Sequence, residues 1–379
     1  MVRFLHTADW QLGMRRHFLE AEALPRFVQG RIDAVARLAE LARDQACQFA
    51  VVAGDVFESN QVEGRTVGRA LDAMAGFSCP VYLLPANHDP LDAGSVYRTA
   101  AFRRGRPNHV HVLEDGRPVE VAPGVELVGA PWSSKRPRRD LAAAALDGLD
   151  ASPNLRILLA HGNVFESYGT TPNPDLIALD GLTRAVEQNV VSYVALGDRH
   201  SATEIAPRIW YSGAPEATDF READAGGALV VDLTREACEV VRHDIGIWRF
   251  AEHEAALHHD DDVAALDAWI EALPGKTTTA LRLKLAGALS VRAHAALEAA
   301  LDRHRERLAA LQERTDDLAL LPDEWSDWKL AGFMRAGADE LAGLAERADG
   351  HAARDALALL YRLQEQGRLE EPTARGLGA

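Results

Sequence analysis

The stretch FAVVAGDVFESN, residues 49–60, decides the fold class of this chain. Its first five residues are apolar, which is typical of a buried β-strand, and Gly54 and Asp55 follow directly. An aspartate after such a glycine is usually a turn residue. The same arrangement recurs elsewhere in the chain, however, and this repetition favours a functional role.

Four further apolar runs end in polar side chains that can bind a metal ion. They are RFLHTAD (3–9) with Asp9 and the nearby Gln11, VYLLPANHD (81–89) with Asn87 and His88, LRILLAHGN (155–163) with His161, and VVSYVALGDRH (190–200) with Asp198 and His200. In parallel α/β sheets, ligands bind beyond the carboxyl ends of the strands. We therefore expect all five strand ends to lie at one edge of a single sheet and to form one site.

Helical patterns separate these strands. Residues 22–44 place Val28, Ile32 and Val35 on one face, and a second helical pattern surrounds Leu71. This alternation of strands and helices predicts an α/β layered fold. From residue 208 the runs RIWYSG, GALVVDL and CEVVRHDI follow without helices between them, which predicts antiparallel strands that form or complete a second sheet.

The pattern changes near residue 246 and predicts three parts. Residues 1–245 form the α/β domain. Residues 246–325 form a small α+β module, with helices over 261–273 and 291–312 and strands over 280–287 and 318–322. Residues 326–379 are rich in Ala and Leu, which predicts one or two amphipathic helices whose leucines pack on their own domain or dock on a partner.

The composition is that of a globular protein without a membrane segment. The chain has 379 residues, 47% of them hydrophobic, and its longest apolar runs have the length of strands. A net charge of −16 argues against nucleic-acid binding through a bulk positive field. Cys47, Cys79 and Cys238 are odd in number and far apart, which predicts unpaired thiols and a cytoplasmic protein.

The donor atoms at the five strand ends are oxygens and two imidazoles, with no thiolate among them. Such a set argues against a cysteine-bound zinc cage but suits Mn²⁺, Fe²⁺, Mg²⁺ or Zn²⁺ used for hydrolysis. We expect two divalent ions, Mn²⁺ first, with Mg²⁺ or Fe²⁺ as alternatives. Two ions that share one carboxylate can activate a water and hold a phosphate for in-line attack. His88 would then donate a proton, or stabilise charge, at the leaving oxygen.

The motifs FLHTADWQLG, VVAGDVFES, LPANHDP and YVALGDRHS, in this order, resemble those of the calcineurin-like metallophosphoesterases. The chain is similar to the branch that contains the nuclease subunit of the bacterial SbcC–SbcD complex. The resemblance covers about residues 1–230 and implies a four-layer α/β/β/α sandwich, a small α+β capping domain and C-terminal helices. It implies an exonuclease of DNA repair whose partners are DNA and an SbcC-like coiled-coil ATPase, and it allows a homodimer.

The resemblance also implies a role for each candidate ligand. The first ion would be held by Asp9, Gln11, Asp55 and His200, and the second by Asp55, Asn87, His161 and Asp198, with His88 as the catalytic histidine. Gln11 and Asp198 stand where the family has histidine, and Glu58 stands where relatives often carry His or Asp. Both ligand changes keep a donor for hard ions, so they either retune or weaken the site.

Basic residues in loops are candidates for contacts with DNA phosphates. They are Arg15, Arg16, Arg103, Arg104 and Arg136, and the alternative is that they are solvated loops of an acidic protein. Trp10, Trp132 and Trp210 either stack on bases or pack in the core. Two other functions stay open: a small-molecule or nucleotide phosphoesterase of the same superfamily, and a catalytically weak scaffold that binds DNA or a partner.

Overall fold

The computed structural model describes residues 1–19, 21–165, 176–222, 224–321 and 332–345, with the short pieces 352–353, 356–357 and 359–360. The chain divides into two compact units, Met1–Arg249 and Phe250–Ala379. Each unit has a hydrophobic core of its own, so each is described by itself.

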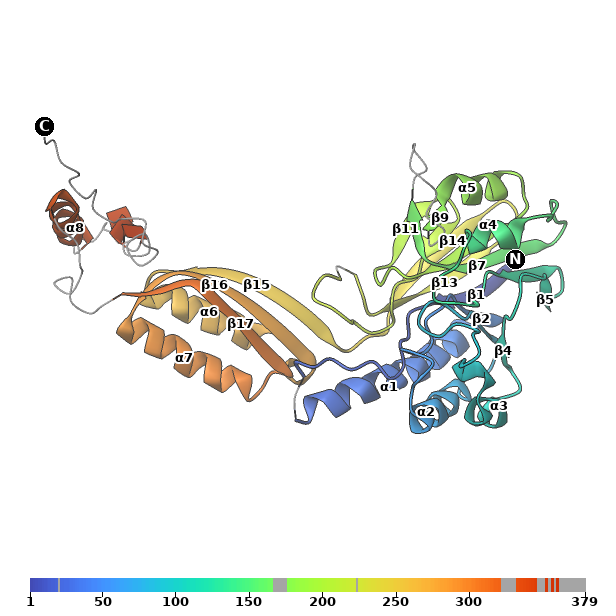
Figure 1. Ribbon diagram of the computed structural model, residues 1–379, viewed down its shortest axis with the longest axis horizontal. Helices are drawn as coiled ribbons and strands as arrows, with labels where there is room; N and C mark the ends of the chain where they lie inside the picture. Colours follow the sequence, from blue (N-terminus) through green and yellow to red (C-terminus); the bar gives the residue numbers. More distant parts are fainter. Residues whose placement is uncertain are drawn as a thin grey trace, which may run out of the picture. The chain divides into compact units, whose positions relative to one another are not determined.

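Two six-stranded sheets form the centre of the first unit (Figure 1). The order of the first sheet is β14 (Cys238–Asp244), β13 (Gly227–Leu233), β1 (Val2–Thr7), β2 (Phe49–Val52), β3 (Val81–Leu83) and β4 (Val110–Val112). The order of the second sheet is β11 (Thr203–Ala206), β12 (Ile209–Tyr211), β10 (Tyr193–Gly197), β7 (Leu155–His161), β6 (Val125–Gly129) and β5 (Val119–Ala122). Neighbours pair in parallel from β1 to β4 and from β6 through β7 and β10 to β12. The first sheet is therefore antiparallel at one edge, through β13 and β14, and the second sheet is antiparallel at both edges.

The central strands are buried on both faces, which is why their sequences are unbroken apolar runs. Side chains alternate along β2: Phe49 and Val51 pack between the two sheets, while Ala50 and Val52 pack against helices. β7 and β10 alternate in the same way from the other side. The side chains that face inward from both sheets therefore form one layer of core between them.

Helices cover the two outer faces of this pair of sheets. The helices α1 (Ala23–Asp44), α2 (Gly64–Met74) and α3 (Ala100–Gly105) pack on the first sheet, and α4 (Leu141–Leu146) and α5 (Leu179–Glu187) pack on the second (Figure 1). A 3₁₀ turn (Val96–Arg98) and the paired short strands β8 (Asn163–Phe165) and β9 (Leu176–Ala178) complete the unit. The expected α/β/β/α sandwich is confirmed.

The runs that follow residue 208 are divided between the sheets. β12 pairs in parallel with β10 in the second sheet, whereas β13 and β14 pair antiparallel with each other and extend the first sheet beside β1. The expectation that these runs form or complete one second sheet was therefore partly wrong. The apolar pattern of a strand does not indicate which of two stacked sheets it will join.

The second unit contains a three-stranded sheet with two helices on one face (Figure 1). The sheet order is β15 (Arg249–Leu257), β16 (Thr279–Ser290) and β17 (Ala310–Leu321), and the helices are α6 (Asp260–Ala272) and α7 (Val291–Arg305), with a 3₁₀ turn at Lys276–Thr278. Leu281, Leu283 and Leu285 of β16 point to the helices, whereas Arg282 and Lys284 between them pair with Glu252 (3.3 and 2.6 Å). One face of the sheet is thus apolar and the other is charged.

Helix α7 is shorter, and the strand after it longer, than the sequence predicted. The expected helix 291–312 was wrong because α7 ends at Arg305, and the expected strand 318–322 is part of the longer β17. Ala309 N–H donates to Lys276 O and Thr279 O (3.0 Å each), which leads the chain into parallel pairing with β16. The polar residues that begin β17 concealed this strand; Gln312, for example, accepts from Arg282 of β16 (3.0 Å).

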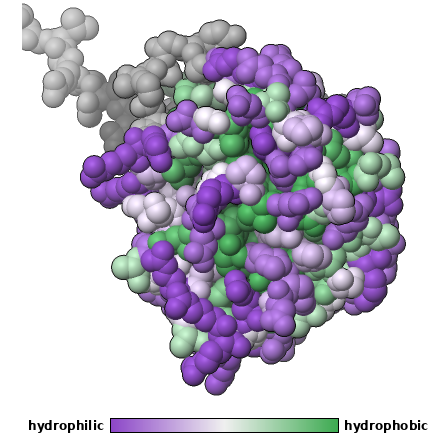
Figure 2. Space-filling view, turned by 90° about the vertical axis from the view of Figure 1, so that its right-hand side faces the viewer, coloured by the Kyte–Doolittle hydropathy of each residue, from purple (hydrophilic) through white to green (hydrophobic). Residues whose placement is uncertain are grey.

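The described part of residues 326–379 contains helix α8 (Gly332–Ala345). Apart from three short pieces, the remainder lies outside the described residues, so much of the predicted amphipathic helices lies there too. Among the described helices, none combines the length and apolar character needed to cross a bilayer. The face shown in Figure 2 is largely hydrophilic, with a hydrophobic band near its centre.

Candidate metal centre

The candidate ligands come from both sheets, so the expectation of a single sheet edge was wrong. Asp9 and Asp55 follow β1 and β2 of the first sheet, whereas His161 ends β7 and Asp198 follows β10 of the second sheet. The two sheets present the carboxyl ends of these strands to one another, and Asp198 N–H donates to both carboxylate oxygens of Asp9 (3.2 and 3.1 Å). A strand end carries the same sequence signal in either sheet, so the sequence could not separate them.

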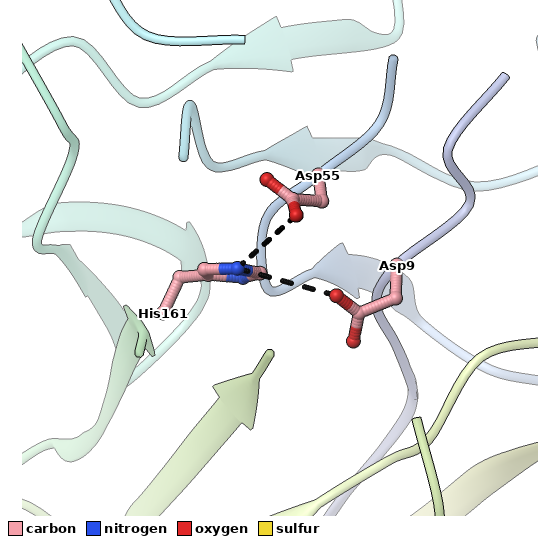
Figure 3. A group of neighbouring side chains, drawn as sticks. All are labelled: Asp9, Asp55 and His161. Carbon is pink, nitrogen blue, oxygen red and sulfur yellow. Dashed lines mark ion pairs between the residues drawn. The ribbon is translucent and has the colours of Figure 1, made fainter. Parts of the chain in front are cut away.

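Three buried side chains form the centre of the site (Figure 3). Asp9, Asp55 and His161 each offer one ligand atom, and these atoms all lie within 4.8 Å of one another. His161 Nε2 is 3.4 Å from Asp55 Oδ2 and 4.0 Å from Asp9 Oδ1. Two carboxylates and an imidazole at this spacing are suited to bind a divalent cation.

The hydrogen bond at the far side of the imidazole fixes the orientation of His161. Its Nδ1–H donates to Ala53 O (2.8 Å), since a carbonyl can only accept. This bond leaves Nε2 facing the carboxylates of Asp9, Asp55 and Asp198, the last at 3.8 Å. A histidine held through Nδ1 with Nε2 free has the arrangement of a metal ligand.

Buried atoms without partners test whether the other candidate residues suit a metal. Gln11 Oε1, Asn87 Oδ1 and His161 Nε2 are buried and have no hydrogen-bond partner. An unsatisfied buried polar atom costs about 1–3 kcal/mol, so three in one site need a reason. All three atoms are of the kinds that coordinate hard or borderline cations. The residues present therefore fit a divalent metal.

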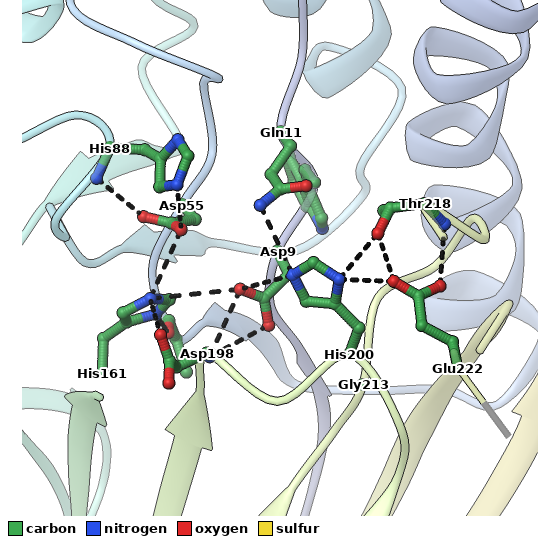
Figure 4. A network of polar contacts seen from close by, with 12 residues as sticks. Asp9, Gln11, Asp55, His88, His161, Asp198, His200, Gly213, Thr218 and Glu222 are labelled. Atoms are coloured by element: carbon green, nitrogen blue, oxygen red, sulfur yellow. Dashed lines mark hydrogen bonds and ion pairs between the residues drawn. The ribbon is translucent and has the colours of Figure 1, made fainter. Parts of the chain in front are cut away.

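His200 and Gln11 lie beside the central group (Figure 4). His200 Nε2 is 3.9 Å from Asp9 Oδ1. The amide nitrogen of Gln11, Nε2, is 3.4 Å from His200 Nε2. Asn87 directly precedes His88, whose backbone N–H donates to Asp55 Oδ1 (3.1 Å). The structure therefore brings six of the seven predicted ligands to one place, and Asn87, whose buried Oδ1 has no hydrogen-bond partner, is adjacent in sequence to the residue that bonds to Asp55.

Two residues that the sequence analysis missed orient His200. Glu222 Oε1 accepts from His200 Nδ1 (2.6 Å), and Thr218 Oγ1 lies 2.7 Å from the same nitrogen. Thr218 donates to Glu222 through its backbone N–H (2.7 Å) and through its hydroxyl (Figure 4). The acceptor carboxylate holds the proton on Nδ1 and keeps Nε2 available toward Asp9. Neither residue belongs to a motif, and the stretch GAPEATDFRE carries no signal that would have identified them.

Burial and charge shift the pKa values of the central group. Burial is the largest effect on Asp9 and raises its pKa to about 6, although His161 and His200 oppose this shift. Burial would also raise the pKa of Asp55, but the charges of His161 and His88 and the hydrogen bond from the His88 backbone lower it. Burial disfavours a charged His161, yet Asp55, Asp9 and Asp198 raise its pKa to about 10. The carboxylates thus favour positive charge at the centre of the site, whether a proton or a cation supplies it.

His88 lies at the edge of the site and is the most accessible of its histidines. Its Nδ1–H donates to Glu58 O (2.8 Å), and its Nε2 lies 3.9 Å from Asp55 Oδ2. The side chain is 37% exposed, compared with 0% for His161 and 23% for His200. His88 can therefore exchange a proton with a bound substrate, whereas His161 is enclosed.

The backbone at the candidate ligands has an unusual conformation. Asp9, Gln11, Asp55 and Asp198 have φ values of 56°, 44°, 52° and 103°. Residues with side chains rarely adopt positive φ, and each such residue costs on the order of 1–3 kcal/mol. Backbone hydrogen bonds between the loops oppose this strain: Asp9 N–H donates to Gly54 O (3.0 Å) and Gln11 N–H to Asp55 O (2.8 Å).

A buried carboxyl group joins the loops that follow β2 and β3. Asp89 accepts from Phe57 N–H, Ala86 N–H and the hydroxyl of Tyr97 (3.0, 3.0 and 2.6 Å). Burial, the largest effect, raises its pKa to about 7. Asp89 therefore fixes the loop of Asp55 against the loop of Asn87, and its place two residues after Asn87 was the sequence signal for it.

The predicted DNA-contacting arginines are not gathered at the site. Arg103 and Arg104 lie in the last turn of α3, and Arg136 is exposed in the loop before α4. Arg15 is exposed after the first motif, and Arg16, which is half-buried, interacts electrostatically with Glu58. Arg16 therefore interacts with the loop whose Glu58 carbonyl holds His88.

The tryptophans beside the motifs belong to the core. Trp10 and Trp132 are buried, with exposed fractions of 1% and 7%. Their indole N–H groups donate to Thr7 Oγ1 (3.0 Å) and His161 O (2.9 Å). These two have no exposed face on which a base could stack, so for them the structure supports core packing. Trp210 is partly buried and packs against the core between the sheets.

Comparison with known proteins gives one curated relative and a family. The chain is 26% identical over 272 residues to the DNA double-strand break repair protein Mre11 of Haloferax volcanii, a match that covers 69% of this chain and 56% of that protein. It thus spans little more than half the length of that relative. Solved structures similar to the chain include TT1561 of Thermus thermophilus (TM-score 0.42, 10% identity) and a dimetal phosphatase of Danio rerio (TM-score 0.34, 13% identity), each match covering 64% of this chain and 99% of the other.

The family match spans the strands and loops that form the site. Residues 2–220 match the calcineurin-like phosphoesterases, and this range includes every candidate ligand from Asp9 to His200. The predicted class of enzyme, a hydrolase of phosphoester bonds, is confirmed with it. The chain belongs to the calcineurin-like phosphoesterase family.

Proposed function

We propose that this chain is a metal-dependent DNA nuclease that hydrolyses phosphodiester bonds, as an exonuclease of DNA repair. The observation that carries the proposal is the buried group of Asp9, Asp55 and His161, with His88 accessible at its edge. Similarity to a relative named as a DNA double-strand break repair protein supports a nucleic-acid substrate rather than a small molecule.

Two divalent ions are proposed, with Asp55 as their shared ligand. Asp9, Gln11 and His200 would hold the first ion together with Asp55, and Asn87, His161 and Asp198 would hold the second. Oxygen donors predominate, which favours Mn²⁺ over a softer ion. When bound, such ions polarise phosphoryl oxygens and lower the pKa of the attacking water.

His88 is proposed as the proton donor to the leaving oxygen. The carbonyl of Glu58 holds the proton of Nδ1, so Nε2 is the nitrogen free to exchange a proton at the edge of the site. Its exposed position allows a strand of DNA to reach it. General acid catalysis of this kind contributes roughly 10²–10⁴-fold to the rate.

The proposed partners are DNA and an SbcC-like coiled-coil ATPase, with a homodimer as the proposed assembly. Arg16, beside Glu58, is the best supported phosphate contact; Arg15, Arg103, Arg104 and Arg136 are proposed as further contacts. A cytoplasmic location is proposed because the thiols of Cys47, Cys79 and Cys238 are all unpaired.

Cleavage of linear duplex DNA with Mn²⁺ tests this proposal. We expect His88→Ala to lose cleavage by roughly 10²–10⁴-fold while it still binds Mn²⁺, because His88 is not a proposed ligand. Asp55→Ala should lose both cleavage and Mn²⁺ binding. A matched control is His109→Ala, because His109 contacts Met74 O (3.1 Å) rather than the site, and it should retain both.

Two results would contradict the nuclease assignment. Hydrolysis of nucleotides by the wild-type chain without cleavage of the polymer would favour a nucleotide phosphoesterase. DNA binding without Mn²⁺ binding or hydrolysis would favour a scaffold.

A further inference from the structure

One buried arginine bonds to the backbone of two loops at the metal centre. Arg31 lies on α1 with an exposed fraction of 2%. Its Nε and Nη2 donate to Trp10 O (3.0 and 2.7 Å), and Nη2 also donates to Asp9 O (3.2 Å). Its Nη1 donates to Glu216 O and Ala217 O (3.4 Å each). All of these acceptors are backbone carbonyls, so Arg31 holds main chain in place.

The first of these loops is the strained one. Asp9 and Gln11 have positive φ on either side of Trp10, a conformation that the chain adopts only where its surroundings impose it. The carbonyls of Asp9 and Trp10 turn toward the helix and accept from Arg31. The cost of the strained backbone is thereby offset at the residue that carries the Asp9 carboxylate.

The second loop leads to the group that orients His200. Ala217 precedes Thr218, which lies 2.7 Å from His200 Nδ1 through Oγ1 and also bonds to Glu222. One guanidinium therefore joins the backbone of Asp9 to the backbone that holds the partners of His200. These two side chains come from different sheets, and His200 Nε2 lies 3.9 Å from Asp9 Oδ1.

We propose that Arg31 is a positioning residue of the metal centre, which sets the separation of Asp9 and His200 by holding the main chain of both loops. The proposal rests on the proposed function, since it assigns Arg31 to the ion that those residues would share. Arginine suits the task because its planar group offers five donors in fixed directions, whereas a lysine ammonium is a single nitrogen on a flexible stem.

The same helix provides a matched control. Arg37 donates to Ile245 O (2.7 Å) and to the carboxylate of Glu216 (2.5 Å), so it also ties α1 to the loop near residue 216. It does not bond to the carbonyls of Asp9, Trp10 or Ala217. Replacement of either arginine by lysine removes hydrogen bonds between α1 and the loop near residue 216, but only Arg31→Lys releases the main chain of the Asp9 loop.

Two measurements compare Arg31→Lys and Arg37→Lys with the wild-type chain. Hydrogen exchange of peptides that cover residues 8–12 and 214–218, without metal, reports the loops themselves. Calorimetric titration with Mn²⁺ measures the affinity of the metal centre for this ion. We expect Arg31→Lys to accelerate exchange in both segments by about tenfold, and to weaken Mn²⁺ binding by roughly 10–100-fold, as removal of a residue that orients metal ligands does. Arg37→Lys should change the exchange of residues 8–12 and the Mn²⁺ affinity less than twofold, although it also loosens residues 214–218 through its partner Glu216.

The proposal fails if Arg31→Lys alters the exchange of residues 8–12 and the Mn²⁺ affinity no more than Arg37→Lys does. It also fails if Arg31→Lys and Arg31→Gln lose the fold as a whole, since Arg31 would then be a general core residue. If the wild-type chain binds no Mn²⁺, the proposed function is contradicted, and the hydrogen exchange alone decides whether Arg31 holds the two loops.

Discussion

Substitution of Gly54 by alanine should damage the metal centre through a single methyl group. Gly54 has a φ of +105°, and a Cβ at this position would lie 2.2 Å from His161 Nδ1 and 2.8 Å from Ala86 Cβ. Contacts this short cannot persist, so the imidazole must move. It then loses the bond from Nδ1 to Ala53 O (2.8 Å) that directs Nε2 toward Asp9 and Asp55.

The expected loss of stability has three parts. A side chain at positive φ costs roughly 1–2 kcal/mol, the overpacked core about 1–3 kcal/mol, and the lost hydrogen bond about 1 kcal/mol. The sum is on the order of 3–6 kcal/mol. For a unit of this size each kcal/mol lowers Tm by about 2–4 °C, so Tm should fall by on the order of 10–20 °C.

Gly148→Ala is a control that adds backbone strain without a steric clash. Gly148 also has a positive φ, +75°, but no heavy atom lies within 4 Å of the position of its Cβ. This variant should lose only about 1–2 kcal/mol and should bind Mn²⁺ with unchanged affinity. Circular dichroism would measure Tm, and calorimetric titration would measure Mn²⁺ affinity, which should fall at least tenfold in Gly54→Ala. If Gly54→Ala matched Gly148→Ala in both measurements, the described packing of His161 would be wrong.

Three further outcomes are expected. Glu222→Gln should weaken Mn²⁺ binding by roughly 10–100-fold in a calorimetric titration, because a neutral amide holds the His200 proton less firmly; unchanged affinity would contradict the role of Glu222. Burial lowers the pKa of His6 to about 3, so the stability that its neutral form contributes is complete above its unfolded pKa of about 6.5 and is lost as the pH falls toward 3. Urea unfolding should therefore show a loss of about 2 kcal/mol between pH 6.5 and pH 5 from this residue, and an equally steep loss in His6→Gln would refute the assignment. Mn²⁺ at 100 times its Kd should stabilise the chain by about 2.7 kcal/mol, an effect that EDTA reverses and that Asp55→Ala should lack.

The sequence predicted the layers better than the connections between them. β2, β7 and β10 were recognised because strands covered on both faces are continuous apolar runs. That same feature hid which sheet each strand joins, and the ligands were wrongly assigned to one sheet. β17 was mostly missed because its polar first half, around Gln312, has no apolar pattern and is a strand only through its pairing with β16.

The candidate metal ligands were predictable from the sequence because they follow strands. The residues that hold these ligands in place were not predictable. Asp9, Asp55, His161 and His200 were identified from their places after strands, and the structure brings them together. Arg31 lies on the buried face of α1 among apolar residues. The helix was recognised from those apolar residues, so its one buried arginine was not noticed. Glu222 acts through His200, and its contact depends on three-dimensional proximity that no local pattern records.

The distance along the chain between the ligands has a consequence for how the molecule folds. Asp9 and Asp198 are 189 residues apart and meet only through contact between the two sheets. Closing so long a loop is entropically costly and slow, and it must precede any coordination. No fragment with one sheet alone can assemble this set of donors, so we expect the centre to be among the last features of the first unit to form. Appearance of Mn²⁺ affinity during refolding would therefore mark the moment at which the two sheets dock.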